Sequence, residues 1–250
     1  MEVIFIENLR SYERKSLLSL SSVNIPDTQL FIRIPTVGEI LEDEFAYYSM
    51  ISSLTASPFD YMVQLDDMGI DFTAISDYEL FKMLFLVYTK SDLSVLFGDL
   101  DVSDFKIYRG NDNDTYIYSP SNHIEINEKV YNNLVCTIRK INLLEKVNYK
   151  PGNESAKKYL LEKERKKQKR DAKKKQEPYL EKLVIALVNT SEFPYNYDSC
   201  MDLSIYRFNQ SFRQIQHKIA FDKTMIGVYA GTVDTSKLSS KDALNWIPDK

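Results

Sequence analysis

The chain has 250 residues, of which 44% are hydrophobic and 27% are charged, and its formal net charge is −4. This composition is ordinary for a globular protein of one or two domains, and the small numbers of glycine (seven) and proline (eight) disfavour a loop-rich all-β fold. Its two cysteines, Cys136 and Cys200, stand in no C-x-x-C pattern, which excludes a disulfide framework. The most apolar run (83–88) is too short to span a bilayer and the first residues do not form a signal peptide, so we expect a soluble, intracellular protein.

Local signals predict short strands and a capped helix at the start of the chain. Apolar runs rich in Ile and Phe at 2–6 and 30–34 predict strands. Thr36, with Glu39 three residues later, forms a capping box, which starts a helix. Apolar residues then recur at helical spacing, so this helix is expected to continue as far as Ile51.

Two further helices are predicted before residue 90. The dipeptide Ser57-Pro58 predicts the start of one, and Gly69 predicts its end. A second capping box, SDYE, precedes a helix at 77–88. Because this helix is apolar nearly all round, we expect it to be central and buried. Its apolar residues are Tyr78, Leu80, Phe81, Met83, Leu84, Phe85 and Val87.

The middle of the chain predicts a β-hairpin followed by a helix. Alternating residues on both sides of the turn sequence GNDND predict a hairpin at about 104–119. Ile124 and Ile126 predict a short additional strand. From Asn127 to Ile141, apolar residues at helical spacing predict an amphipathic helix.

Charge is strongly segregated along the sequence. Residues 157–175 contain eleven Lys or Arg and three acidic residues, a net charge of +8, whereas residues 38–104 contain fourteen acidic residues and two Lys, a net charge of −12. The apolar stripe of the basic segment stops near Leu161, so its polar part is expected to leave the core as a helix standing in water.

Three interpretations of this basic helix remain open. It is a solvated helix stabilised by its own i, i+3 and i, i+4 ion pairs, or it docks on an acidic protein surface such as 38–104 of a neighbouring copy, or it binds phosphates. Nucleic acid comes third, because the chain as a whole is acidic and no aromatic residue interrupts 160–178. The residues assigned to partner binding here are Lys166, Lys167 and Arg170.

Apolar residues near the C-terminus form a heptad seam. Pro178 breaks the basic helix, after which apolar residues define a buried face at 180–188. The seam, with alternating spacings of four and three, is Met201, Ile205, Phe208, Phe212, Ile215 and Ile219. It either packs in the chain's own core or receives a partner helix, and for the second case the predicted partner-binding residues are Met201, Ile205, Phe208 and Phe212.

These elements predict a mainly helical α+β fold, with a few short strands, one β-hairpin and a protruding basic helix. The expected organisation is an N-terminal α+β part (1–150), a linker with the basic helix (151–178) and a helical C-terminal part (179–250). We expect neither a cofactor nor a membrane partner.

No catalytic or metal-binding constellation is recognisable. The two histidines, His123 and His217, are far apart in sequence and far from both cysteines, which disfavours a zinc site. The motifs of phosphate-binding loops, dinucleotide-binding folds and serine hydrolases do not occur. The acidic groups at 110–114 and 99–104 are better explained as a turn and a solvated loop than as cation sites. We therefore expect no metal site and no enzymatic activity.

Four stretches carry a family resemblance: RIPTVGEIL (33–41), MDLSIYRFNQSF (201–212), IGVYAGTVDTSKL (226–238) and LNWI (244–247). They resemble tail assembly chaperones encoded in the tail-gene clusters of phages of Gram-positive bacteria. The resemblance implies a non-enzymatic factor that binds a phage structural protein, either the tape-measure protein or the tube subunit. It also implies a location in the host cytoplasm, with the virion as the alternative.

Two other functions stay open. The first is a structural virion component, in the tail or connector, whose charge-segregated surfaces make copy-to-copy contacts. The second is a nucleic-acid-binding regulator that uses the basic helix. Presence in purified virions would favour the first, and salt-sensitive DNA binding would favour the second.

Overall fold

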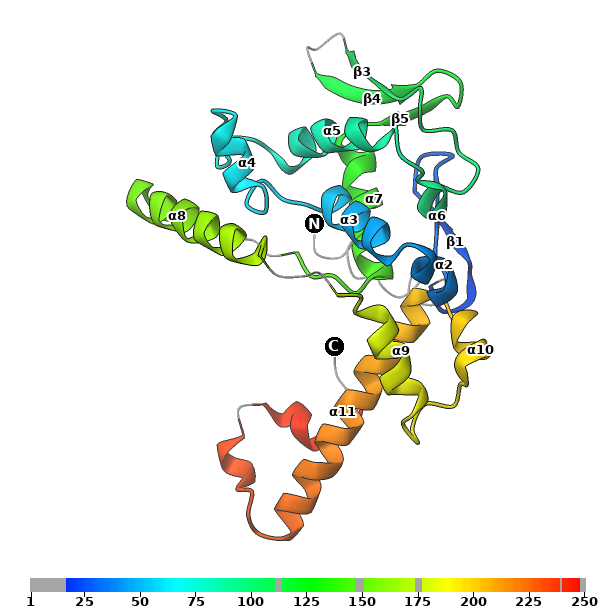
Figure 1. Cartoon of the computed structure of the whole chain (residues 1–250), viewed down its shortest axis with the longest axis vertical. Helices are drawn as coiled ribbons and strands as arrows, with labels where there is room; N and C mark the ends of the chain where they lie inside the picture. Colours follow the sequence, from blue (N-terminus) through cyan, green and yellow to red (C-terminus); the bar gives the residue numbers. More distant parts are fainter. Residues whose placement is uncertain (1–16, 111–113, 147–150, 174–176, 239, 248–250) are drawn as a thin grey trace.

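The computed structural model describes residues 17–110, 114–146, 151–173, 177–238 and 240–247, and it confirms a mainly helical α+β fold with two small antiparallel sheets (Figure 1). The strand predicted at 2–6 lies outside these residues. The strands are β1 (Ser22–Asn24), β2 (Phe31–Arg33), β3 (Lys106–Arg109), β4 (Thr115–Ser119) and β5 (Ile124–Ile126). The helices are α2 (Val37–Glu42), α3 (Glu44–Leu54), α4 (Met62–Asp67), α5 (Asp77–Tyr88), α6 (Ser94–Phe97), α7 (Glu128–Ile141), α8 (Glu154–Asp171), α9 (Leu180–Val188), α10 (Tyr197–Met201) and α11 (Ile205–Tyr229), followed by 3-10 turns η1 (Thr235–Lys237) and η2 (Lys241–Leu244).

Both sheets are small and antiparallel. Strands β1 and β2 pair with Val23 opposite Ile32, which confirms the strand expected at 30–34. Strands β3, β4 and β5 form a three-stranded sheet in that order, so the hairpin and the additional strand are both confirmed. In its centre Ile117 pairs with Ile107 on one side and with Ile126 on the other.

The first two predicted helices begin or end differently from the sequence prediction. The capping box at Thr36 is present, but the helix expected to reach Ile51 is divided into α2 and α3 at Asp43. The Asp43 carboxylate accepts the backbone N–H of Ala46 at 3.0 Å and starts a new helix. Helix α4 begins at Met62 instead of Pro58, because the Asp60 carboxylate accepts from both the amide and the hydroxyl of Ser57 and holds a turn there.

Helix α5 begins after its predicted capping box, and only one side of it is buried in the core. Phe81 and Phe85 are almost completely buried, whereas Met83 is 38% exposed and Val87 is 66% exposed. The expectation that every side is buried is therefore wrong. Helices α3 and α7 cover α5, but its remaining side faces solvent.

One hydrophobic core joins the N-terminal and C-terminal parts of the chain. It contains buried side chains from α2, α3, α5 and α7 together with others from α9, α10 and α11. Two backbone hydrogen bonds, each 2.8 Å long, close the junction: Val37 N–H donates to Leu203 O, and Ile205 N–H donates to Pro35 O. The division into parts at 150 and 178 stays a prediction, since the described residues share this core.

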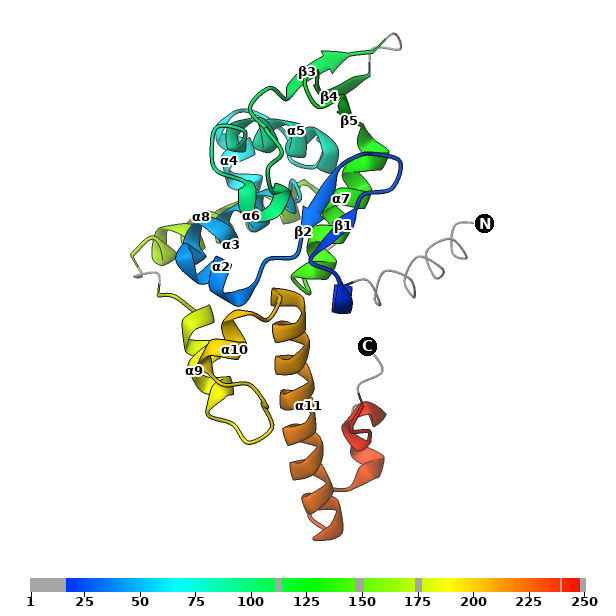
Figure 2. The same cartoon turned by 90° about the vertical axis from the view of Figure 1, so that its right-hand side faces the viewer.

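The second half of α11 and the turns after it project from the body of the molecule (Figures 1 and 2). Gly231, with φ of 70°, ends this long helix and reverses the chain. At Gly227 a Cβ atom would lie 2.6 Å from Cγ2 of Val233, so any larger residue there would have to displace the Val233 side chain of the returning segment. Among the helices described, none is long and apolar enough to cross a membrane.

Candidate partner-binding surfaces

Helix α8 lies against a small hydrophobic cluster that is separate from the main core. Leu161 is buried and Leu160 is half-buried against this cluster. Its other buried members, contributed by α4, α5 and the segments flanking α4, are Ala56, Met62, Val63, Leu65, Phe72 and Leu80. Figure 1 shows α8 beside α4 at one edge of the molecule. Two leucines therefore make the apolar part of this contact.

Ion pairs also hold α8 against α4 and the segment that follows it. Arg165 bridges two carboxylates of α4, with its Nη2 atom 2.7 Å from Asp66 Oδ2 and 2.6 Å from Asp67 Oδ1. One turn into the helix, Lys157 Nζ lies 2.7 Å from Asp71 Oδ1. These carboxylates raise the pKa of both basic side chains. The basic helix thus docks on an acidic surface of its own chain.

This contact corrects the expectation that the polar part of the helix stands wholly in water. The helix is surrounded by solvent only beyond Arg165, because its preceding turns pack against α4. Of the ion pairs expected within the helix, the structure describes that of Glu164 with Lys167, at 3.3 Å. The inner face of α8 is therefore bound, and its outer face is free for a second contact.

Acidification should loosen the seat of α8. The hydrogen bond from Lys157, together with those from the hydroxyl and amide of Thr73, lowers the pKa of Asp71 from 3.8 to about 2. Because the ionised form is favoured in the folded state, the pair stabilises docking above pH of about 4, and this stabilisation is lost as the pH falls through about 2. NMR titration of the side-chain carboxyls should show the low midpoint of Asp71, and Lys157→Met should move it up toward 3.8. An unchanged midpoint in this variant would contradict the pairing.

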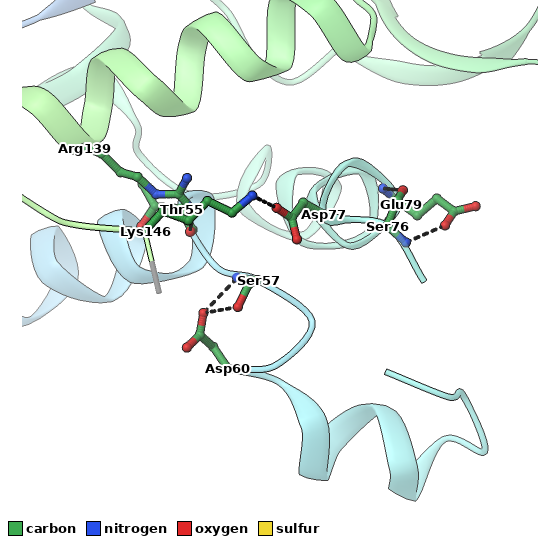
Figure 3. Close-up of polar contacts among 8 residues, drawn as sticks. All are labelled: Thr55, Ser57, Asp60, Ser76, Asp77, Glu79, Arg139 and Lys146. Atoms are coloured by element: carbon green, nitrogen blue, oxygen red, sulfur yellow. Dashed lines mark hydrogen bonds and ion pairs between the residues drawn. The ribbon is translucent and has the colours of Figure 1, made fainter. Parts of the chain in front are cut away.

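A cleft of about 760 Å³ lies between the first turn of α8, the turn after α3 and the start of α5. Its apolar walls are Pro58, Phe59, Phe72, Ile75 and Pro151. Figure 3 shows the polar contacts around it, in which Lys146 pairs with Asp77 at 2.5 Å and Arg139 donates to Thr55 O. Of the described residues, the two lysines that line the cleft, Lys146 and Lys157, are each paired with a carboxylate.

The projecting segment, residues 220–247, is called the arm here. Its exposed apolar side chains include Ile226 (69% exposed), Tyr229 (83%), Trp246 (55%) and Ile247 (54%). The end of the arm is held along α11, since Gln214 Nε2 donates to Trp246 O at 2.9 Å and His217 Nε2 lies 2.6 Å from Asn245 O. The single tryptophan of the chain is therefore displayed on the surface at a fixed place. Exposed aromatic and aliphatic groups of this kind are typical of interaction surfaces.

The residues predicted to bind partners fall into two groups. Lys166, Lys167 and Arg170 are exposed on α8. Ile205 and Phe208 are fully buried in the chain's own core, and Met201 and Phe212 are half-buried against it. The first part of the heptad seam is thus already occupied by the chain itself in this conformation.

The sequence did not predict which residues hold α8 against α4, nor which residues of the arm are exposed. Lys157 and Arg165 were not distinguished from the other basic residues, although the acidic pair Asp66-Asp67 was visible in the sequence. Ile226 and Tyr229 lie in the part of α11 beyond the seam, and both side chains are exposed there.

Within the described ranges, no group of three or more His, Cys, Asp or Glu side chains is placed to hold a metal ion. His123 has a φ of 52° and lies with its Nδ1 atom 3.4 Å from the hydroxyl of Tyr118. His217 supports the arm, as described above. The surfaces of α8 and of the arm are therefore the candidate binding surfaces of the described part of the chain.

Comparison with known proteins bears on the C-terminal third. Residues 172–249 match a sequence family described as the YomV second domain. The name is that of a gene in a Bacillus phage region, so this part of the chain matches a phage-associated family. The match contains α9, α10, α11 and the arm. No curated protein and no solved structure matches the chain. The phage association expected from the resemblance is thus confirmed, and the role in tail assembly stays a prediction.

Proposed function

We propose that the protein is a non-catalytic phage tail morphogenesis factor, a tail assembly chaperone that binds the tape-measure protein. Three facts support this: the resemblance of four sequence stretches, the phage-associated match at 172–249, and the exposed apolar arm within that match. The arm is the observation that carries the proposal, because a chaperone of this kind needs apolar surface that its own fold leaves uncovered.

The chemistry of the arm suits a long apolar helix as partner. Large aromatic side chains dominate binding energy at interfaces, and Tyr229 and Trp246 are both exposed here. Ile226 and Tyr229 lie three residues apart on α11 and so occupy neighbouring positions on its surface. An exposed helix that presents apolar side chains in this way can pack against an amphipathic helix of another protein.

Substitutions in the arm should weaken partner binding without unfolding the protein. We expect the variant Ile226→Ser/Tyr229→Ser to bind the long helical structural protein of the same gene cluster at least about tenfold more weakly than the wild type. Co-expression followed by affinity purification and titration of the partner measures this loss.

The matched control is Val87→Ser, which removes an apolar side chain that is 66% exposed on α5, outside the arm. It should leave binding unchanged. If the control and the arm variant lose affinity equally, or if neither loses any, the arm is not the binding surface and the chaperone proposal lacks its support.

A structural virion component is the second candidate, and the exposed basic side chains of α8 favour it because charged surfaces commonly set contacts between subunits. Mass spectrometry of purified virions separates the two candidates. A chaperone is left behind in the host cytoplasm, whereas a tail or connector component is recovered with the particles. A regulator that binds nucleic acid is the third candidate, and it is tested together with the contact proposed below.

A further inference from the structure

The outward face of α8 carries a basic stripe. Its members are Tyr159, Lys163, Lys166 and Arg170, spaced by four, three and four residues, and Lys173 follows just beyond the end of the helix. This spacing keeps them in one line on a helix, opposite the face that Leu161 and Arg165 seat on α4. At 1.5 Å per residue the stripe is about 17 Å long.

The stripe is exposed and its charges are largely unpaired. Tyr159 is 65% exposed, and the side chain of Arg170 is 69% exposed, with its Nε 3.5 Å from Asp171. For Lys163, Lys166 and Lys173 the described part of the chain provides no ion-pair partner. Lys163 and Lys166, with the exposed Arg170 and with Lys173 just beyond the helix, are thus available to a surface that lies outside this copy of the chain.

A groove of complementary charge lies elsewhere on the molecule. It is about 370 Å³ in volume and runs between α2, the start of α3 and the segment from Tyr88 to Val95. Its carboxylates are Glu39, Glu42, Asp43 and Asp92, and Arg33 is the one basic side chain that lines it among the described residues. Arg33 pairs with Glu39, which leaves the groove acidic.

These carboxylates are held in place. Asp43 accepts from Ala46 N–H at 3.0 Å, and Asp92 accepts from Ser94 N–H at 2.8 Å. The second contact lowers the pKa of Asp92 below its ordinary value. Glu42 is exposed at the end of α2. Figure 1 shows α8 and α4 on the left of α3, and α2 and α6 on its right, so α8, which carries the stripe, lies across α3 from α2, which lines the groove.

We propose that the basic stripe of α8 binds the acidic groove of a second copy of the chain. The inner face of the same helix already makes a contact of this kind, because Arg165 there pairs with two carboxylates of α4. The two surfaces differ, so the contact is head-to-tail, and repetition gives a ring or an open chain of copies. This contact uses neither the arm nor its partner and is independent of the proposed function.

The first test is self-association of the full chain. Sedimentation velocity over a concentration series should show oligomers at 0.1 M salt that dissociate at 1 M, because the screening length falls from about 10 Å to about 3 Å over this range. A chain that stays monomeric at 0.1 M salt throughout the series overturns the proposal.

Two complementary variants test the surfaces themselves. The stripe variant is Lys163→Glu/Lys166→Glu/Arg170→Glu. The groove variant is Glu42→Lys/Asp43→Asn/Asp92→Asn, in which the asparagines can still accept the backbone hydrogen bonds of the native aspartates. Each variant alone should be monomeric. Mixed in equal amounts they should form a one-to-one dimer and nothing larger, since each retains one intact surface. A mixture that stays monomeric, or a stripe variant that associates like the wild type, contradicts the head-to-tail contact.

Charge reversal of an unrelated surface is the matched control. Lys106→Glu/Arg109→Glu changes two exposed basic residues of β3 and should associate like the wild type. Circular dichroism checks that each variant is folded, and Lys166→Gln/Arg170→Gln gives a milder version of the stripe variant that should also weaken association.

A parallel titration with random duplex DNA tests whether the stripe binds nucleic acid instead of a second copy of the chain. DNA binding that is tighter than about 10⁻⁶ M and is abolished in the stripe variant, with protein association unaffected, would assign the stripe to nucleic acid.

Discussion

Replacing Phe85 with alanine should lower the free energy of unfolding by about 3–5 kcal/mol, which is the usual cost of removing a buried phenylalanine. Phe85 is fully buried, and its ring stacks on Phe81 at a centroid distance of 5.3 Å. It also meets the rings of Phe97 and Phe105 edge-on, at 6.3 and 5.6 Å. The substitution would leave a cavity that helix α5 cannot close, because its neighbours on both sides are themselves packed.

The same helix supplies the control. Val87→Ala, two residues further on, removes methyl groups from a side chain that is 66% exposed and should change stability by less than about 0.5 kcal/mol. Equilibrium unfolding in urea measures both variants. Equal effects at the two positions would mean that α5 is not oriented as described.

Phe208→Ala should be about as damaging, with an expected loss of roughly 3–5 kcal/mol. Phe208 is fully buried where α11 enters the core, and its ring meets that of Phe193 edge-on at 6.2 Å. Because the residue lies in the core that joins both parts of the chain, the whole protein should unfold in one transition at lower denaturant concentration.

A comparison along α11 decides between a core seam and a partner-binding seam. Ile226→Ala, on the same helix, removes a side chain that is 69% exposed and should leave stability within about 0.5 kcal/mol of the wild type. If Phe208→Ala instead left stability intact and abolished partner binding, the seam would belong to the partner, as one interpretation of the sequence proposed.

The elements that could be predicted from the sequence are those with local causes. The capping boxes at Thr36 and Ser76 close hydrogen bonds over three residues, and both are present. The hairpin depends on a short turn between alternating residues, and it is present too. The break at Asp43 was missed because apolar residues at helical spacing continue across it, and spacing alone does not show where one helix ends and the next begins.

Features set by distant parts of the chain could not be predicted. The periodicity of α5 does not say that Val87 lacks a neighbour, because this depends on where α3 and α7 pack. The charge of α8 predicted an acidic partner, but not that Arg165 would find it in Asp66, 99 residues away. Lys166 and Arg170 are exposed, as expected for the polar part of the helix, and their role in partner binding stays a prediction. The arm carried no pattern that distinguished it from a core segment.

The Glu44 carboxylate accepts the backbone N–H groups of Tyr179 and Leu180, at 2.7 and 2.9 Å, the second of them 136 residues later in the chain. On the ribosome, at about 5–20 residues per second, this interval takes roughly 7–27 seconds to translate. During that time α3, α5 and α7 are added in turn to the nascent chain, while α9, α10 and α11, which complete their core, are still missing. The apolar surface of these helices is therefore incompletely covered until synthesis reaches the C-terminal helices.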